Sequence, residues 1–202
     1  MTNTLPDAPA TGRNREPILA VLREAFAGRR HVLEIGSGTG QHAVFFAEAL
    51  PDLQWQTSDL PDRHEAIAAW IAASGLDNVL SPIALAVERP EQWPAQRYDA
   101  VFSANTLHIM GWPQVRALFA NLPAALASEA SVVIYGPFNI GGEFTSPSNA
   151  AFDAQLRAAD PQRGIRDLEA VRELAESAGL AFVADIPMPA NNRCLVLRRV
   201  GR

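Results

Sequence analysis

Short apolar runs alternate with helical patterns along most of this 202-residue chain. Strand-like runs of this kind occupy residues 31–36, 53–59, 79–87, 98–105 and 130–138. Strands that alternate with helices predict a mostly parallel sheet with helices on both faces. The last two strand-like runs, 181–186 and 193–199, are separated only by PMPANN, which is too short for a parallel crossover. We therefore predict a seven-stranded, Rossmann-like α/β sheet whose terminal strand runs antiparallel.

Composition is that of an ordinary globular domain and argues against several partners. With 48% hydrophobic and 19% charged residues, the chain is expected to form one domain over residues 1–202, with residues 1–12 flexible. A net charge of −5 and the lack of a basic run argue against nucleic acid as a partner. No apolar stretch approaches the ~18 residues of a membrane span, and residues 1–12 do not resemble a secretory signal. We therefore expect a cytoplasmic protein with no membrane partner.

The only cysteine, Cys194, lies in the strand-like run RCLVLRR and is interpreted as a buried strand residue. A lone cysteine cannot form an internal disulfide, and it cannot build a zinc site based on paired cysteines. The four histidines and the acids show no set of metal ligands. We expect no metal ion.

The stretch HVLEIGSGTGQHAVFF, residues 31–46, carries three glycines in five positions between a strand-like run and a helical pattern. Rossmann-like folds bind their ligands at this turn. Gly36, Gly38 and Gly40 permit positive φ and remove every Cβ from the path of a close ligand. Their G-x-G-x-G spacing differs from the G-x-G-x-x-G that seats a dinucleotide pyrophosphate. Glu34 would repel a pyrophosphate but suits a cationic amino group, so the turn favours S-adenosylmethionine (SAM) over NAD.

A second acid ends the next strand-like run. Asp59 lies 19 residues after Gly40, at a position where a strand-end carboxylate can accept hydrogen bonds from both ribose hydroxyls of a nucleoside. NAD sites use the same device, so Asp59 indicates a nucleoside without distinguishing between the two cofactors. The alternative is that Asp59 only caps the segment that follows, LPDRHE.

These residues resemble motif I of class I SAM-dependent methyltransferases. More narrowly, the chain resembles the small domain-of-unknown-function methyltransferase family that includes methyltransferase-like protein 26. The matching stretches are RNREPIL (13–19), LEIGSGTGQHAVFFA (33–47), WQTSD (55–59), NTLHI (105–109), YGPFNIGGEFTSPSNAAFDAQLRAADPQRGIRDLE (135–169) and NNRCLV (191–196). They span almost the whole chain. The resemblance implies a seven-stranded methyltransferase fold that binds SAM, and it implies no particular substrate.

The predicted SAM contacts cluster around the glycine turn and the strand ends. They are Arg13, Asn14, Glu34, Gly36, Ser37, Gly38, Gly40, Gln41, His42, Asp59, Leu60, Ala86, Val87, Asn105 and Thr106. Ala86 departs from the family's pattern, because the third strand commonly ends in an acid that accepts a bond from the adenine amino group. We expect backbone groups near Ala86 and Val87 to hold the adenine, with apolar packing, at a loss of about 0.5–1.5 kcal/mol.

The stretch RNREP, residues 13–17, precedes the first strand, where such proteins often have a lid helix over the cofactor. Pro17 is expected in the first turn of that helix. Arg13 and Arg15 have a guanidinium shape that suits the SAM carboxylate or an anionic substrate. The alternative is that these residues form a solvated helix start.

Two segments are expected on the side of the methyl acceptor. One is SANTLHIMGW (103–112), in which His108 is either a general base or a loop residue bonded to backbone. The other is the long segment 137–164, predicted as a substrate-side insertion around a short helix. The candidate catalytic residues are His108 and Tyr135. The candidates for substrate binding, each of which can instead be structural, are Arg15, Asn139, Thr145, Ser146, Asn149, Phe152 and Arg166.

The sequence thus predicts a SAM-dependent methyltransferase that acts on a small molecule. SAM brings its own activated methyl group, so the protein supplies mainly orientation and desolvation. Two alternatives stay open. An NAD(P)-dependent reductase is disfavoured by the glycine spacing and by Glu34, and a non-catalytic SAM-binding module gains slight support from Ala86. The residues leave open the acceptor, the methylated atom and the oligomeric state.

Overall fold

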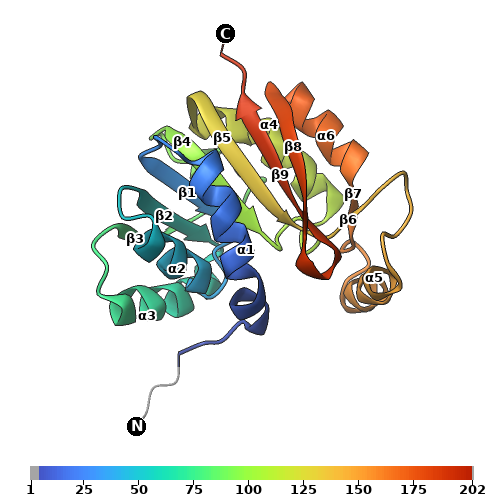
Figure 1. The fold of residues 1–202 in the computed structure, drawn as a ribbon, viewed down its shortest axis with the longest axis horizontal. Helices are drawn as coiled ribbons and strands as arrows, with labels where there is room; N and C mark the ends of the chain where they lie inside the picture. The colour runs from blue at the N-terminus through green and yellow to red at the C-terminus, as the bar shows by residue number, and fades with distance from the viewer. Residues whose placement is uncertain (1–4, 202) are drawn as a thin grey trace.

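The computed structural model describes residues 5–201. Its main sheet has seven strands in the order β3-β2-β1-β4-β5-β9-β8 (Figure 1). The strands are β1 (His31–Ile35), β2 (Gln54–Asp59), β3 (Val79–Ala84), β4 (Tyr98–Ala104), β5 (Leu126–Gly136), β8 (Leu180–Met188) and β9 (Asn192–Arg199). Neighbours from β3 to β5 pair in parallel, whereas β9 is antiparallel to both β5 and β8. The predicted α/β class, strand number and reversed terminal strand are confirmed.

Helices cover both faces of this sheet (Figure 1). One face carries α1 (Pro9–Ala25), α2 (Gln41–Ala49) and α3 (His64–Ser74), and the other carries α4 (Trp112–Ala125) and α6 (Leu168–Ser177). Three short 3-10 helices complete the connections: η1 (Pro61–Arg63), η2 (Pro90–Gln92) and η3 (Pro189–Asn191). Within residues 5–201, none of these helices is both long and apolar enough to cross a membrane.

The sheet separates two hydrophobic cores. Successive strand side chains point to opposite faces, so Val32 packs with α1 and α2 whereas Leu33 packs with α4 and α6. On β5, Val133 and Ile134 divide in the same way. Because both faces are covered, the central strands are apolar on both sides, as parallel sheets usually are.

The segment between β5 and α6 forms a small unit of its own. It contains α5 (Pro147–Ala159) and a two-stranded parallel sheet of β6 (Phe138–Asn139) and β7 (Arg166–Asp167). In Figure 1, α5 lies at the end of the main sheet opposite the C-terminus of the chain. Because β9 runs antiparallel, this is the end where β1, β2, β4 and β5 finish. The predicted insertion therefore lies at the carboxyl ends of the parallel strands.

The start of the chain differs from expectation. Residues 1–4 lie outside the described part, and residues 9–12, expected to be flexible, form the first turns of α1. Pro9 takes the first helical position and Pro17 lies in the helix interior. The reason is an anchor before the helix: Ala8 N donates to Gln41 Oε1 at 2.6 Å, and Trp70 Nε1 donates to Pro6 O at 2.7 Å. These long-range bonds fix the entry into α1 earlier than local sequence signals suggest.

Candidate functional site

The glycine turn joins β1 to α2 at the carboxyl end of the sheet. Gly36 has a φ of 75°, and a Cβ placed there would lie 2.8 Å from the Thr106 side chain. Both Gly36 N and Ser37 N donate to Ser58 O at 3.0 Å. Gly38 N donates to Asp59 Oδ2 at 2.7 Å. The turn is thus bonded to the end of β2 and approaches the loop after β4 so closely that only glycine fits at position 36.

A cavity with two lobes opens at this turn. The first lobe, about 510 Å³, is lined by Ala8, Ala10, Thr11, Gly36, Ser37, Gly38, Thr39, His42, Asp59, Leu60, Asp62, Arg63, Ala104, Asn105, Thr106, Ile109 and Arg163. The second lobe, about 310 Å³, is lined by Ile35, Gly36, Asp59, Leu60, Leu85, Ala86, Val87, Glu88, Thr106, Ile109, Met110, Gln114, Asp160 and Arg163. The lobes share six lining residues and therefore meet. Their volumes are typical of small-molecule sites.

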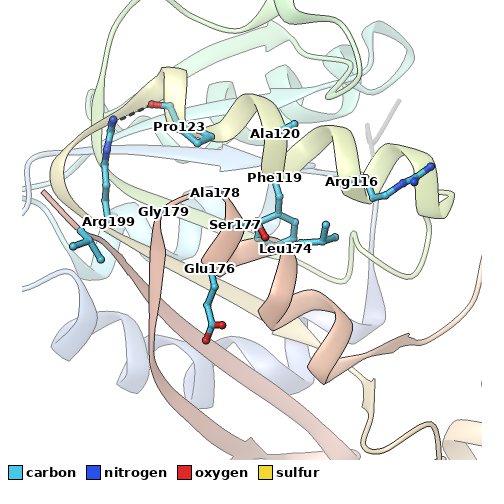
Figure 2. Close-up of a pocket in the computed structure, with 11 residues that line it drawn as sticks. Arg116, Phe119, Ala120, Pro123, Leu174, Glu176, Ser177, Ala178, Gly179 and Arg199 are labelled. Atoms are coloured by element: carbon cyan, nitrogen blue, oxygen red, sulfur yellow. Dashed lines mark hydrogen bonds between the residues drawn. The ribbon is translucent and has the colours of Figure 1, made fainter. Parts of the chain in front are cut away.

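A larger cavity, about 650 Å³, lies between α4, α6 and the end of β9 (Figure 2). Its lining includes Arg116, Leu174 and Arg199, and Arg199 Nη1 donates to Pro123 O at 3.0 Å. It lies where β9 ends and β8 begins, which is the amino-terminal end of the parallel strands. Ligands of open α/β sheets bind beyond the carboxyl ends of the strands. The two-lobed cavity is therefore the candidate site.

Asp59 occupies the junction of the two lobes. Its Oδ2 accepts a hydrogen bond from Gly38 N, and its Oδ1 accepts one from Leu60 N, each at 2.7 Å. Burial raises the pKa of Asp59, while these two backbone bonds act in the opposite direction. The residue that caps η1 is Leu60, not Asp59. The geometry therefore favours the cavity-facing interpretation of Asp59 over the capping one.

Glu34 does not lie where we expected it. It was expected to face a cationic group of the ligand, but only 1% of it is exposed, and it lines neither lobe among the described residues. Its Oε2 accepts hydrogen bonds from Ser37 Oγ and from Trp55 Nε1, both at 3.0 Å. Glu34 thus links the glycine turn, through Ser37, to Trp55 of β2. Burial raises the pKa of its carboxyl group to about 7, against the effect of the two hydrogen bonds.

This raised pKa predicts a pH-dependent stability difference between the protein and Glu34→Gln. A carboxyl group whose pKa is higher in the folded state stabilises that state below its unfolded pKa of 4.5, and this stabilisation disappears as pH rises through about 7. From pH 4.5 to pH 8, the difference in unfolding free energy should therefore shift in favour of the glutamine variant by ~3 kcal/mol. Urea denaturation at several pH values measures it. The exposed Glu48→Gln is the control, and equal slopes for both variants would contradict the prediction.

His42 lines the first lobe as a neutral imidazole. Its Nε2 lies 2.8 Å from Asn14 Oδ1, and its ring stacks on Phe46 with 5.3 Å between centroids. Burial, and then the charge of Arg15, lowers the pKa of His42 to about 4. At neutral pH this side chain therefore adds no positive charge to the lobe, and it does not repel a cationic ligand.

Besides Glu34, four predicted cofactor contacts lie outside the lining of both lobes, within the described residues: Arg13, Asn14, Gly40 and Gln41. Asn14 positions His42, and Gln41 holds the segment before α1 through Ala8 N and Asp7 Oδ1. That segment and the first turn of α1 supply Ala8, Ala10 and Thr11 to the first lobe, which sequence reasoning missed. Two alanines and a threonine carry no sequence signal that could have identified them.

On the acceptor side, His108 and Tyr135 are buried and line neither lobe in the described part of the chain. The backbone oxygen of His108 accepts a hydrogen bond from Gly164 N at 3.0 Å, and its ring meets the edge of Phe152 at 5.3 Å. Burial, and then the charge of Arg166, lowers the pKa of His108 to about 4. Burial raises the pKa of Tyr135.

Several predicted substrate contacts already have partners within the fold. Ser146 Oγ accepts from Asn149 N at 3.1 Å and so caps α5, and Asn149 Nδ2 donates to Thr145 Oγ1 at 3.0 Å. The pair Ser146-Pro147 is a helix-start signal that could have revealed this role. The guanidinium of Arg15 lies 4.5 Å from the centre of the Phe45 ring. We do not retain these four residues as acceptor contacts.

Arg166 is also engaged internally, with hydrogen bonds to backbone oxygens of the 107–110 loop and of Gln162. Asn139 and Phe152, by contrast, are not fully engaged in contacts within the fold. Asn139 Oδ1 is buried and has no hydrogen-bond partner among residues 5–201, and Phe152 is 36% exposed beside His108. These two residues stay the acceptor-side candidates from the insertion.

Comparisons with known proteins agree with this architecture. A family model described as "Protein of unknown function (DUF938)" matches residues 6–199. An O-methyltransferase family protein from Burkholderia thailandensis has a similar structure, with a TM-score of 0.84 and 19% identity over 95% of this chain and 58% of that one. An O-methyltransferase family 2 protein from Planctomyces limnophilus, in complex with apigenin, has a TM-score of 0.81 and 21% identity, over 95% of this chain and 58% of that one.

PigF with S-adenosylhomocysteine (SAH) is a third similar structure, with a TM-score of 0.76 and 15% identity over 91% of this chain and 61% of that one. At such identities the likeness shows the fold. This chain spans less than two thirds of the length of each of these structures. The class I methyltransferase fold is therefore established, while activity has to be argued from the cavity.

Proposed function

Since this chain belongs to the DUF938 family, whose description names no activity, we propose its function from the geometry of the two-lobed cavity: it is a SAM-dependent methyltransferase that acts on a small molecule. The observation that carries the proposal is the position of Asp59. This carboxylate lies where the lobes meet and is bonded to the glycine turn through Gly38 N. Strand-end carboxylates in this position bind ribose hydroxyls.

The rest of the cavity fits the cofactor on either side of that ribose position. The second lobe has apolar walls from Leu85, Val87 and Ile109, which suit a flat adenine ring. The first lobe has the open backbone of Gly36–Gly38 and the neutral ring of His42, which suit the amino-acid part. The finer resemblance, to the family that includes methyltransferase-like protein 26, supports the same cofactor and stays a prediction.

Residues after β4 and β5 would orient the reacting groups. When bound, SAM supplies an activated methyl group. Asn105 lines the first lobe with a φ of 56°, a conformation that costs a non-glycine residue about 1 kcal/mol and is common at functional sites. Its N donates to Tyr135 O at 2.8 Å, which ties this strained residue to the end of β5. His108 is buried and lines neither lobe among the described residues, so the proposal gives it no proton transfer with a ligand of this cavity.

Calorimetric titration of the purified chain with SAM, SAH and NADH tests the proposal. We expect SAM and SAH to bind with micromolar dissociation constants and NADH not to bind. Binding of NADH alone, or of none of the three, would contradict it. Binding of SAM without a methylated product in a broad screen of small-molecule acceptors would instead favour the non-catalytic SAM-binding alternative.

A further inference from the structure

Residues 160–166, which follow α5, form one wall of the cavity. Arg163 lines both lobes, and Asp160 lines the second lobe together with Ala86 and Val87. Both residues come from the insertion that was assigned to the acceptor side. The cofactor cavity is thus built partly from that insertion.

Four hydrogen bonds fix this wall to the loop after β4 and to itself. Gly164 N donates to His108 O at 3.0 Å, and Arg166 Nε donates to Leu107 O at 3.1 Å. The Nη2 of Arg166 donates to Met110 O and to Gln162 O. Because Arg166 is only 8% exposed, these bonds are shielded from water. Asp160 and Arg163 are therefore presented from a fixed backbone.

Asp160 and Arg163 lie close together at the cavity but are not hydrogen-bonded to each other. Arg163 Nε lies 3.6 Å from Asp160 Oδ2, which is longer than a hydrogen bond. This Nε is buried and has no hydrogen-bond partner within residues 5–201. The other carboxylate oxygen, Oδ1, accepts from Gln162 N at 2.9 Å. Asp160 Oδ2 thus accepts no hydrogen bond within residues 5–201, and it is available to a ligand in the second lobe.

The end of β3 offers this lobe no side-chain acceptor. Ala86 has no polar side chain, and its backbone N already donates to Gln92 Oε1 at 2.7 Å. Besides Asp59, which is assigned to the ribose, the remaining acid of the second lobe is Glu88, which is exposed and accepts from Gln114 Nε2 at 3.3 Å. An ionised carboxylate only accepts hydrogen bonds, so it attracts an amino group and repels a carbonyl oxygen. Asp160 can therefore select a ring that carries an exocyclic amine.

Building on the proposed function, we propose that Asp160 recognises the adenine of the cofactor. Its carboxylate accepts a hydrogen bond from the exocyclic amino group in the second lobe. Arg163, whose Nε lies 3.6 Å from Asp160 Oδ2, lines both lobes and would lie where adenine and ribose meet. Asp160, from the insertion, thereby takes the role of the acid that was expected after the third strand, where this chain has Ala86.

The test compares two ligands in each protein variant. Calorimetry gives dissociation constants for SAH and for S-inosylhomocysteine, which carries a carbonyl oxygen in place of the amino group. The unaltered chain should prefer SAH by about tenfold or more. Asp160→Asn should reduce this preference to about threefold or less, because an amide side chain can both donate and accept. The ratio is taken within each variant, so a general loss of affinity cancels.

Two further variants test whether Glu88 and Arg163 contribute to the preference or to the affinity. Glu88→Gln should keep the full preference for SAH. Arg163→Met, which retains an apolar stem, should weaken the binding of both ligands. An unchanged ratio in Asp160→Asn, or loss of the preference in Glu88→Gln, would overturn the proposal. Failure of the unaltered chain to bind SAH would overturn the proposed function itself, which is a different outcome.

Discussion

Replacing Asp59 with alanine is expected to raise the dissociation constant for SAH by at least ~30-fold, about 2 kcal/mol. Asp59 faces both lobes of the cavity from the end of β2, and its carboxylate is placed to accept charge-assisted bonds from the ribose. The same carboxylate holds Gly38 N, so the variant also loosens the glycine turn. Calorimetric titration of both proteins with SAH measures the effect.

Two controls separate these contributions. Asp59→Asn removes the charge but keeps one acceptor oxygen, which can serve either Gly38 N or Leu60 N, so it should lose a large part of the affinity with a smaller loss of melting temperature than Asp59→Ala. Asp52→Ala alters an aspartate whose side chain is 90% exposed, and it should bind SAH as the unaltered chain does. If Asp59→Ala bound SAH with unchanged affinity, the carboxylate would have no part in ligand binding.

Replacing Gly40 with alanine is expected to lower the free energy of unfolding by about 2–4 kcal/mol. Gly40 precedes the first residue of α2 with a φ of 88°, a conformation that costs an L-residue about 1 kcal/mol or more. In addition, a Cβ there would lie 3.1 Å from Ile67 Cα. That atom belongs to the backbone of α3, and Ile67 is fully buried, so relief requires a shift of the helix.

Gly75→Ala provides the matched comparison. Gly75 ends α3 with a φ of 67°, but a Cβ there meets nothing within 4 Å. Its alanine variant should therefore show only the conformational cost, ~1 kcal/mol. Denaturation of both variants under the same conditions gives the difference. If Gly40→Ala cost no more than Gly75→Ala, the close approach of α2 and α3 would not limit this position.

The candidate site shows which residues a sequence can reveal. Gly36 and Asp59 were predicted as site residues because Gly36 follows β1 and Asp59 ends β2, and strand ends in this fold meet at one edge of the sheet. Glu34 was placed wrongly, although it is in the same motif. The direction of its side chain depends on Trp55 from the neighbouring strand, and no local spacing encodes that contact.

The insertion shows the opposite case. Its composition predicted a functional loop around a helix, and the structure has α5 there. Ser146, chosen as a substrate contact, caps that helix by accepting a hydrogen bond from Asn149 N. Asp160 and Arg163 drew no attention, because nothing in their neighbourhood along the chain points to the glycine turn.

The sequence by itself determined the order of strands and helices, the reversed last strand, and the glycine turn with Asp59 at its side. These features follow from hydrophobic periodicity, loop length and backbone conformation, all of which act over a few neighbouring residues. Only the tertiary structure decided that Glu34 is buried and that Asp160 and Arg163 form a wall of the cavity. Those outcomes depend on packing and hydrogen bonds between segments far apart in the chain, such as the Arg166 bonds to the 107–110 loop.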